Sequence, residues 1–392
     1  MEYKRYYLSA QIDLSAIVHN CKILRQVIPP RCKLCAVVKC NAYGHGVEVV
    51  LPALKTAEVE MLCVATIAEA RQVQELGWEG PILLLGAEFS IYSEKEKEEL
   101  ARWIVESGLR ITVTNKKDVD VLSAAAESLK KPAVVHVKLD TGMTRMGISE
   151  EPLCELIRQI RGNKNIIIEG LYTHFAAADE KDKSFTNYQL QRLTKFIKQL
   201  QTNGIEIPII HCANSAAVLD LHESHFNMIR PGISICGCFP SPEVHNRPDL
   251  KPAMKVVSYL TLVRKIPAGT YIGYGCTYRA SKDMVVGLVP IGYGDGYDRR
   301  LANIGKMTVA GHIVPVVGRI SMDLTTIDLS VPLDKGCKLS ASDEVIIIDN
   351  VRSAPNSVES IAAEIQTTPY ELLTQLGARI VRVAAGPAPV GA

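Results

Sequence analysis

A lysine stands at the point where a short apolar run gives way to polar and glycine-containing sequence. The run Cys35-Ala36-Val37-Val38 precedes Lys39, and Cys40-Asn41-Ala42-Tyr43-Gly44-His45-Gly46 follows it. Such a run is typical of a buried strand, and the residues after it predict a turn that leads into a helix. Partial loss of hydration at the strand end favours the neutral, nucleophilic amine, which can form a Schiff base with an aldehyde cofactor. A lysine in this place can instead extend its ammonium group past the strand end into solvent.

Polar side chains also follow later apolar runs of the chain. They are Lys138, Asp140, Arg145, Tyr172, His174, Asn214, Ser215 and Arg230, with Pro231-Gly232-Ile233 directly after the last. Ser215 opens a predicted helix and Gly232 permits close approach of the backbone, and both features suit the binding of a phosphate group. A serine at a helix start is equally common as an N-cap without any ligand.

These residues need a scaffold that brings the ends of many strands together. Short apolar strands alternate with helical stretches, and we expect eight strands, at Leu34–Lys39, Met61–Ala65, Pro81–Leu85, Leu109–Val113, Ala133–Leu139, Ile166–His174, Pro208–Ala213 and Met228–Cys236. This alternation predicts a parallel sheet covered by helices, and eight such units close as a TIM barrel with its reactive groups at the C-terminal strand ends. We therefore expect an α/β fold in which residues 1–246 form a (β/α)8 barrel that binds the cofactor.

The alternation stops at a proline-flanked connector near residues 246–252. Beyond it, we expect strands at Lys255–Val263, Met284–Pro290, Met307–Ala310, Ile313–Val317 and Glu344–Ile348, and no helix before Ser357–Gln366. Several short strands punctuated by glycine predict a second, mainly β domain over residues 247–392. The tail after Arg382 is expected to be disordered or to form an end strand.

The composition favours a small-molecule partner. The 392 residues carry a net charge of only +2, which argues against a nucleic acid or an anionic membrane as partner. No segment resembles a signal peptide or reaches the length of a membrane span, so we expect a cytoplasmic protein. The chain has 11 cysteines, an odd number that suits free thiols in a reducing compartment. The pair Cys32 and Cys35 has redox or metal-site spacing, but no second pair accompanies it.

Nearly the whole chain resembles the alanine racemases, a family of barrel-type amino-acid racemases that depend on pyridoxal 5'-phosphate (PLP). The resemblance rests on motifs that occur in this order: AVVKCNAYGHG, VKLDTGMTRMG, YTHFAAADE, NSAA, MIRPGIS, GYGCTYRA, PIGYGDGYDRR, GRISMD and TPYE. It implies an enzyme that interconverts L-alanine and D-alanine and supplies D-alanine for cell-wall peptidoglycan.

The resemblance also implies roles for individual residues. Lys39 would carry PLP, and the cofactor phosphate would be held by Tyr43, Ser215, Gly232, Ile233 and Tyr370. His174 would flank the cofactor ring. Arg145 would bind the phenol oxygen of the cofactor and the substrate carboxylate, and Met322 would lie beside the substrate. In this family the lysine at position 138 is often carbamylated, and the resulting anion orients the arginine.

Arg230, Lys39 and Tyr274 bear on the type of PLP chemistry. A carboxylate beside the pyridine nitrogen keeps it protonated in many PLP enzymes. Arg230 in that place would keep the nitrogen unprotonated, because a permanent cation disfavours a second positive charge nearby. Racemisation further needs a base on each face of Cα. The resemblance implies Lys39 for one face and Tyr274 of a second subunit for the other, and hence a homodimer with shared active sites.

Several other functions share part of this pattern. A related PLP-dependent racemase of broader specificity, for example toward serine, shares the same motifs. A non-catalytic PLP carrier has a similar lysine but lacks a β domain, and a PLP decarboxylase would place an acidic residue where Arg230 stands. A metallohydrolase barrel needs a histidine pair at the end of its first strand, where this chain has Lys39, so we expect no metal. Departures from the family pattern are Cys40, Cys236-Gly237-Cys238 and Ser321, and Cys40 suggests sensitivity to thiol reagents.

Overall fold

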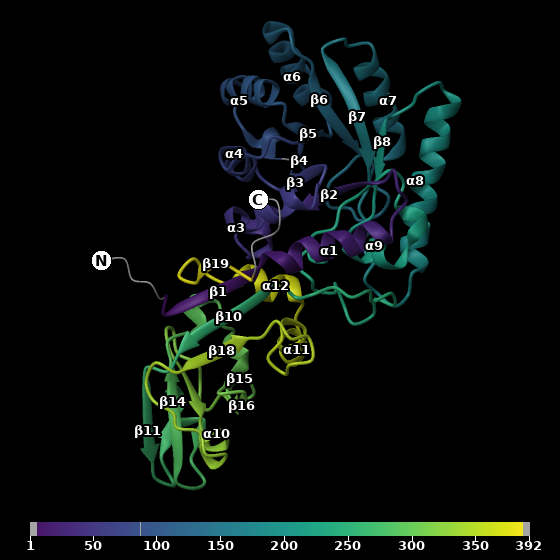
Figure 1. The fold of residues 1–392 in the computed structure, drawn as a ribbon. Helices are drawn as coiled ribbons and strands as arrows, with labels where there is room; N and C mark the ends of the chain where they lie inside the picture. Colours follow the sequence, from purple (N-terminus) through teal and green to yellow (C-terminus); the bar gives the residue numbers. More distant parts are fainter. Residues whose placement is uncertain (1–5, 87, 387–392) are drawn as a thin grey trace.

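Eight parallel strands form the first domain in the computed structural model, which describes residues 6–86 and 88–386. Their order is β8-β7-β6-β5-β4-β3-β2-β9, and each neighbouring pair is parallel. The strands are β2 (Lys33–Val37), β3 (Met61–Val64), β4 (Ile82–Leu84), β5 (Arg110–Val113), β6 (Ala133–Lys138), β7 (Ile166–Tyr172), β8 (Ile209–His211) and β9 (Met228–Ile229). Just beyond β9 and β8, Arg230 N donates to Ala213 O over 2.9 Å, which nearly closes the ring. The predicted barrel is confirmed (Figure 1).

Helices cover the outside of the barrel, each with an apolar face turned inward. They are α1 (Leu14–Gln26), α3 (Val47–Thr56), α4 (Ile67–Glu75), α5 (Glu94–Ser107), α6 (Lys116–Leu129), α7 (Glu150–Arg161), α8 (Ser184–Thr202) and α9 (Ser215–Asp220). In α7, the buried residues Leu153, Ile157 and Ile160 recur at helical spacing. A capping box between Thr66 and Glu69 fixes the start of α4.

The barrel interior is divided into an apolar part and a polar part. The apolar part comes from β2, β3, β4, β8 and β9, and its members are Cys35, Val37, Met61, Cys63, Leu83, Ile209 and Met228. Strands β5 to β8 contribute the buried polar residues Thr112, His136, Lys138, Tyr172 and His211. Thr112 Oγ1 and Tyr172 OH lie 2.9 Å apart although β6 separates their strands. This contact across β6 places the polar side chains inside the ring.

The second domain is mainly β, as predicted. Its strands are β10 (Met254–Tyr259), β11 (Leu262–Ile266), β12 (Tyr271–Ile272), β13 (Tyr278–Arg279), β14 (Met284–Val289), β15 (Lys306–Val309), β16 (His312–Pro315), β17 (Thr325–Asp328), β18 (Glu344–Ile348) and β19 (Val381–Ala385). A six-stranded sheet has the order β16-β15-β18-β10-β1-β19, and β11, β14 and β17 form a three-stranded sheet. The helices are α10 (Ser330–Asp334), α11 (Val358–Glu364) and α12 (Pro369–Gln375).

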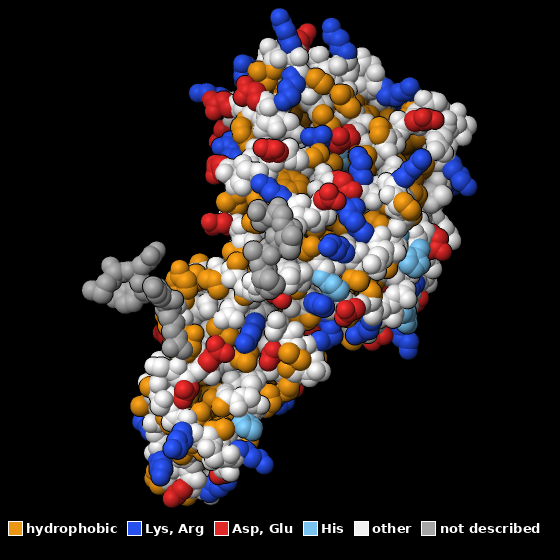
Figure 2. Space-filling view, viewed as in Figure 1, with side chains coloured by type: hydrophobic (Ala, Val, Ile, Leu, Met, Phe, Trp, Pro, Cys, Tyr) orange, Lys and Arg blue, Asp and Glu red, His pale blue; other side chains and the backbone are white. Residues whose placement is uncertain are grey.

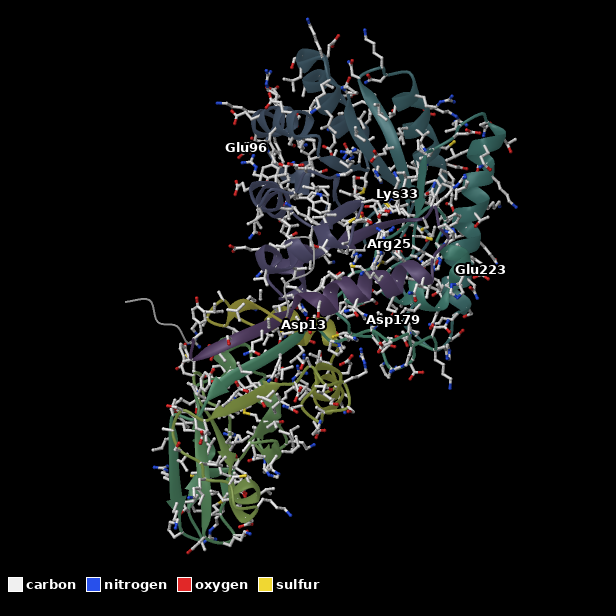
Figure 3. All side chains as sticks on the ribbon, in the orientation of Figure 1. Asp13, Arg25, Lys33, Glu96, Asp179 and Glu223 are labelled. Atoms are coloured by element: carbon white, nitrogen blue, oxygen red, sulfur yellow. The ribbon has the colours of Figure 1, made fainter. Side chains whose placement is uncertain are left out.

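The first strand of the chain, β1 (Leu8–Asp13), belongs to the sheet of the second domain. It pairs antiparallel with β10 and parallel with β19. Asp13 then caps α1, accepting hydrogen bonds from Ser15 Oγ (2.6 Å) and Ala16 N (3.1 Å). Figure 3 shows Asp13 at this passage from β1 into the barrel. The barrel is therefore inserted, in sequence, between β1 and the remaining strands of the second domain.

Some expected boundaries were wrong. The last barrel strand ends at Ile229 and not at Cys236, because Pro231 and Gly232 turn the chain out of the sheet. The strand expected over Lys255–Val263 is two strands, β10 and β11, and α10 precedes the first helix that was expected in the second domain. Strand β19 confirms an end strand after Ile380, and residues 387–392 lie outside the described part of the chain.

The surface of the described residues agrees with the near-neutral charge. On the face that Figure 2 shows, lysine and arginine side chains are interspersed with aspartate and glutamate. Among the helices of residues 6–86 and 88–386, none is both long enough and apolar enough to cross a membrane.

Candidate active site

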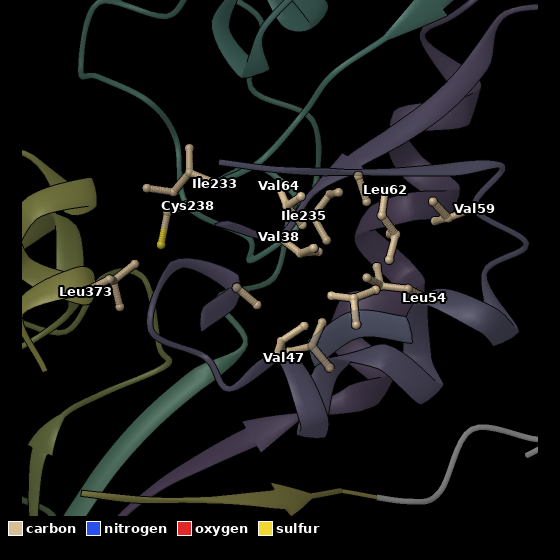
Figure 4. Packing of buried hydrophobic residues seen from close by; sticks show 14 of the residues in the cluster. Val38, Val47, Leu54, Val59, Leu62, Val64, Ile233, Ile235, Cys238 and Leu373 are labelled. Atoms are coloured by element: carbon tan, nitrogen blue, oxygen red, sulfur yellow. The ribbon is translucent and has the colours of Figure 1, made fainter. Parts of the chain in front are cut away.

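The predicted site residues of the barrel meet at the C-terminal ends of its strands. Lys39 follows β2, Lys138 and Tyr172 end β6 and β7, and Arg230 follows β9. Figure 4 shows buried apolar packing around Val38, the residue before Lys39, with Val64 and Ile235 close to it. The strand ends therefore hold several basic groups next to a packed hydrophobic core.

Lys39 leads into a left-handed turn. Cys40, Asn41, Ala42 and Tyr43 have φ values of 51°, 55°, 53° and 52°, a conformation that costs about 1–2 kcal/mol for each L-residue. Contacts from outside the turn hold this conformation. Glu69 Oε1 accepts from Cys40 N (2.7 Å), and Asn41 Oδ1 accepts from Val47 N (2.8 Å). The sequence predicted the turn but not its hand.

Arg382 of β19 holds the far end of the same turn. Its guanidinium is partly buried and donates to Gly44 O over 2.9 Å and to carbonyls at the end of α12. Burial lowers the pKa of Arg382, and the described residues offer it carbonyl oxygens and no carboxylate. The second domain thus fixes the loop that carries Lys39.

Below this turn, hydroxyl and backbone N–H groups converge on a small space. Ser215 Oγ accepts from Gly232 N (2.9 Å) and Ser234 N (3.4 Å), and the rings of Tyr43 and Tyr370 are 5.9 Å apart. Tyr370 comes from α12 of the second domain, and its hydroxyl also reaches Ser215. A Cβ at residue 232 would lie 2.3 Å from Tyr43 OH. Only glycine at residue 232 leaves room for a ligand in this space, which we call the cradle and which is formed by Tyr43, Ser215, Gly232 and Tyr370.

The cradle suits an anion. Burial raises the pKa of Tyr43 and of Tyr370, so both hydroxyls stay protonated and available as donors. Together with Ser215 and the backbone after Pro231, they offer donors from the directions that a phosphate group needs. The residues present therefore fit the phosphate of PLP. Ile233 itself is buried, so it can contribute only its backbone.

Four cationic side chains share the mouth of the barrel. Burial, followed by the positive charges of Arg230, Arg145 and Lys39, lowers the pKa of Lys138 to about 7, and the carboxylate of Asp140 opposes this shift. Lys138 Nζ and the guanidinium of Arg230 lie 5.3 Å and 5.1 Å from the centroid of the Tyr172 ring. Such a cluster attracts anions and makes the neutral form of the Lys138 amine accessible near pH 7.

Arg230 is buried among neutral acceptors. Its Nη1 donates to His211 Nδ1 (2.6 Å), and its Nη2 donates to Thr173 O (2.9 Å) and contacts His174 Nδ1 (3.3 Å). Among the described residues, no carboxylate pairs with it. Burial and then Arg230 lower the pKa of His174 well below its usual value, so this ring is neutral. The guanidinium is therefore a fixed positive charge at this point.

Arg145 lies in the exposed loop after β6. Asp140 Oδ1 shapes that loop by accepting from Gly142 N (3.0 Å) and Thr144 N (3.1 Å). Arg145 makes no hydrogen bond or ion pair with any residue that the structure describes. Its charge nevertheless acts on Lys138 and His174. This leaves its guanidinium free to receive an anionic ligand.

Tyr274 and Met322 lie apart from these groups. They are 71% and 55% exposed on the second domain, and neither makes a hydrogen bond or ring contact with a described barrel residue. The structure of one chain thus brings together every predicted site residue except these two. Sequence reasoning did not single out Glu69, His136, His211 or Arg382. His136 was detectable, because it alternates with Lys138 on one face of β6.

Comparisons with known proteins cover both domains. The family model described as alanine racemase, N-terminal domain, matches residues 12–240, and that of the C-terminal domain matches residues 253–384. An alanine racemase of Methanococcus maripaludis is 40% identical over 377 residues, which cover 95% of this chain and 97% of that protein. One of Desulforamulus reducens is 37% identical over 380 residues, 96% of this chain and 98% of that protein.

Solved structures give the same result. The alanine racemase of Streptomyces lavendulae is 32% identical and has a TM-score of 0.88. The match covers 98% of this chain and 98% of that one. That of Bartonella henselae, solved with covalently bound pyridoxal phosphate, is 28% identical with a TM-score of 0.83 and coverage of 97% of this chain and 100% of that one.

Proposed function

The chain belongs to the alanine racemase family and interconverts L-alanine and D-alanine, and we propose that it does so with PLP bound covalently to Lys39. The observation that carries this proposal is the phosphate cradle of Tyr43, Ser215, Gly232 and Tyr370 beside that lysine. We further propose that the enzyme works in the cytoplasm and supplies D-alanine for peptidoglycan.

PLP, when bound, supplies a conjugated ring that withdraws the electrons left at Cα when the substrate loses its proton. The residues of the chain would bind the cofactor, orient it and control the protonation of its ring. Tyr43, Ser215, Tyr370 and the backbone at Gly232 and Ile233 would anchor the phosphate, and His174 would flank the ring. Arg230 would hold the pyridine nitrogen unprotonated, since its own charge is permanent. Return of the proton to Cα then prevails over side reactions such as transamination.

Racemisation requires proton transfer at both faces of Cα. Lys39 would move the proton on one face, and Tyr274 of a second subunit would move it on the other. Met322 of that subunit lies beside the substrate. Within one chain Tyr274 and Lys39 make no contact, so the site is incomplete without a partner.

Exposed side chains around Tyr274 support a homodimer. Tyr271, Tyr274, Tyr293 and Met322 are all at least 44% exposed, although such side chains are usually covered. They are adjacent in space: Tyr293 N bonds Ser321 O beside Met322, and a Cβ at Gly275 would meet the side chain of Arg319 in the same loop. A second subunit that covers them would place its own barrel mouth at Tyr274.

Arg145 binds the substrate carboxylate and the phenol oxygen of the cofactor. We propose that Lys138 reacts with carbon dioxide as a neutral amine to give a carbamate, which balances the local positive charge and orients Arg145. The lowered pKa of Lys138 supports this, because only the neutral amine reacts. A 13C carbonyl signal after exposure to labelled bicarbonate, absent in Lys138→Met, would test it.

The experiment that tests the proposed function begins with the absorbance spectrum of the purified enzyme. We expect the visible absorption of lysine-bound PLP, and borohydride should attach the cofactor permanently to the peptide that contains Lys39. An enantiomer assay then follows conversion of L-alanine to D-alanine, with L-serine as the test of broader specificity. Attachment to any other lysine would contradict the assignment.

A further inference from the structure

A chain of hydrogen bonds leads from Arg230 through the barrel interior. Arg230 Nη1 donates to His211 Nδ1 (2.6 Å), His211 Nε2 lies 2.9 Å from His136 Nδ1, and His136 Nε2 lies 3.0 Å from Glu169 Oε2. Arg110, the first residue of β5, donates to both oxygens of Glu169 over 3.2 Å and 3.3 Å. The chain joins a buried guanidinium at the barrel mouth to an ion pair at the opposite ends of the strands.

Two features of β7 make room for this chain. The register between β6 and β7 shifts after Val135, so Glu169 is an extra residue between Ile168 and Gly170. A bulge of this kind redirects a side chain, and here it brings the carboxylate to His136. At Gly170 a Cβ would lie only 2.2 Å from His136 Nδ1. Glycine is therefore required for the imidazole to occupy its place.

With Arg230 in its present place, the hydrogen bonds run in only one direction. An arginine side chain has donors and no acceptor, so His211 Nδ1 must accept and its hydrogen must be on Nε2. That hydrogen points at His136 Nδ1, which leaves the hydrogen of His136 on Nε2, facing Glu169. Burial lowers the pKa of both histidines, so each ring is neutral and has a single N–H. Burial opposes ionisation of Glu169, but hydrogen bonds from His136 and Arg110 outweigh it and lower its pKa to about 2.

We propose that Glu169 is a positioning residue for Arg230: the carboxylate fixes the tautomers of His136 and His211, and these hold the guanidinium in the orientation that meets the cofactor ring. The role at the ring rests on the proposed function, whereas the order of the tautomers belongs to the protein alone. With both tautomers reversed, an N–H of His211 would point at a donor of Arg230. The arginine would then have to turn away from its present place.

The test compares the enzyme with its Glu169→Leu variant. Leucine has a similar size but no acceptor, so the Nε2 hydrogen of His136 would be buried without a partner. We therefore expect the hydrogens of His136 and His211 to move from Nε2 to Nδ1, and Arg230 to turn away. Two-bond 1H–15N correlation spectra of the full-length protein labelled with 15N-histidine report this directly, and removal of each histidine in turn assigns the signals. We further expect kcat to fall about 10- to 100-fold with little change in KM for alanine, and pyruvate from side transamination to increase.

Arg110→Met is the matched control. It breaks the same ion pair but leaves the carboxylate on His136, so we expect the wild-type tautomers and a kcat within about 2-fold of wild type. Equal effects of Glu169→Leu and Arg110→Met would overturn the proposal, because they would show only the loss of an ion pair. Unchanged tautomers in Glu169→Leu would overturn it as well.

The wild-type spectrum is itself decisive. A hydrogen on Nδ1 of His211 would refute the proposed direction even if Glu169→Leu failed to fold. The spectra do not depend on catalysis. If they are as expected but Arg230 variants do not alter the fate of the substrate, the tautomer order stands and the proposed role of Arg230 at the ring fails.

Discussion

The hydroxyl of Tyr43 lies where a side chain at residue 232 would have to be, since a Cβ added to Gly232 would come within 2.3 Å of it. The two residues follow neighbouring parallel strands of the barrel, Tyr43 after β2 and Gly232 after β9. Their contact defines one wall of the phosphate cradle, and any side chain at 232 must displace the tyrosine or the strand end that carries it.

Gly232→Ala should therefore weaken cofactor binding. Loss of one charge-assisted hydrogen bond to phosphate costs about 1.5–3 kcal/mol, which corresponds to roughly 10- to 100-fold in the Kd for PLP. Titration of the cofactor-free enzyme with PLP measures this. Gly162→Ala is the control, because its Cβ would meet nothing closer than 3.8 Å. An unchanged Kd in Gly232→Ala would show that the phosphate binds elsewhere.

Arg230→Glu should change the fate of the substrate. A carboxylate in this place permits protonation of the pyridine nitrogen, so side transamination should rise while racemisation slows. The ratio of pyruvate to D-alanine formed from L-alanine is the measurement. The proposed role of Arg230 fails if that ratio is the same as in the wild-type enzyme.

Lys138 should make stability depend on pH. Its pKa is about 7 in the folded protein, because of burial and then the nearby arginines, against about 10.4 in an unfolded chain. Between these values the unfolded chain binds a proton that the folded chain does not, so the free energy of unfolding should rise with pH by up to about 1.4 kcal/mol per unit. Urea unfolding in CO2-free buffer at pH 7, 8 and 9 should show a smaller slope for Lys138→Met. Equal slopes would mean that the folded-state pKa is not lowered.

Mixing two defective chains should restore activity. In a heterodimer of Lys39→Ala and Tyr274→Phe chains, one site has both defects and the other combines an intact Lys39 with an intact Tyr274. Activity should approach that of one wild-type site in each heterodimer after subunit exchange. If exchange is proven by mass spectrometry and the mixture is no more active than its parents, the sites are not shared.

Tyr274→Phe should separate the two bases. Loss of a positioned general base costs about 10²- to 10⁴-fold, and racemisation should slow in both directions because the equilibrium between the enantiomers is fixed. In deuterated water, D-alanine should still exchange its Cα hydrogen through Lys39, whereas L-alanine should exchange far more slowly. Equal slowing for both enantiomers would contradict this division.

The sequence predicted most of the barrel because its strands are apolar and its helices regular. Each of the eight strands was anticipated, with errors mainly where Pro231 and Gly232 turn the chain early. Strand β1 was not anticipated, since its partners, Met254–Tyr259 and Val381–Ala385, are remote in sequence. Pairing over such separations leaves no local pattern.

The site was predicted to the extent that strand-end positions and motifs define it. Lys39, Lys138 and Arg230 lie together because parallel strands end at one edge. The left-handed turn after Lys39 could not be predicted, because Glu69 and Arg382 hold it from other elements. His211 and Glu169 were missed for a related reason: their contacts depend on a bulge and on barrel closure.

The place of β1 in the second sheet bears on how the protein is made. β1 precedes the whole barrel in the chain, but its neighbours β10 and β19 begin only at Met254 and Val381. At a translation rate of about 5–20 residues per second, β10 is synthesised roughly 10–50 s after β1. The barrel has all its strands before then, while the loop bearing Lys39 still lacks Arg382. Folding of the catalytic loop is thereby coupled to the synthesis of β19, and a chain cut short before β19 should contain a barrel without a formed active site.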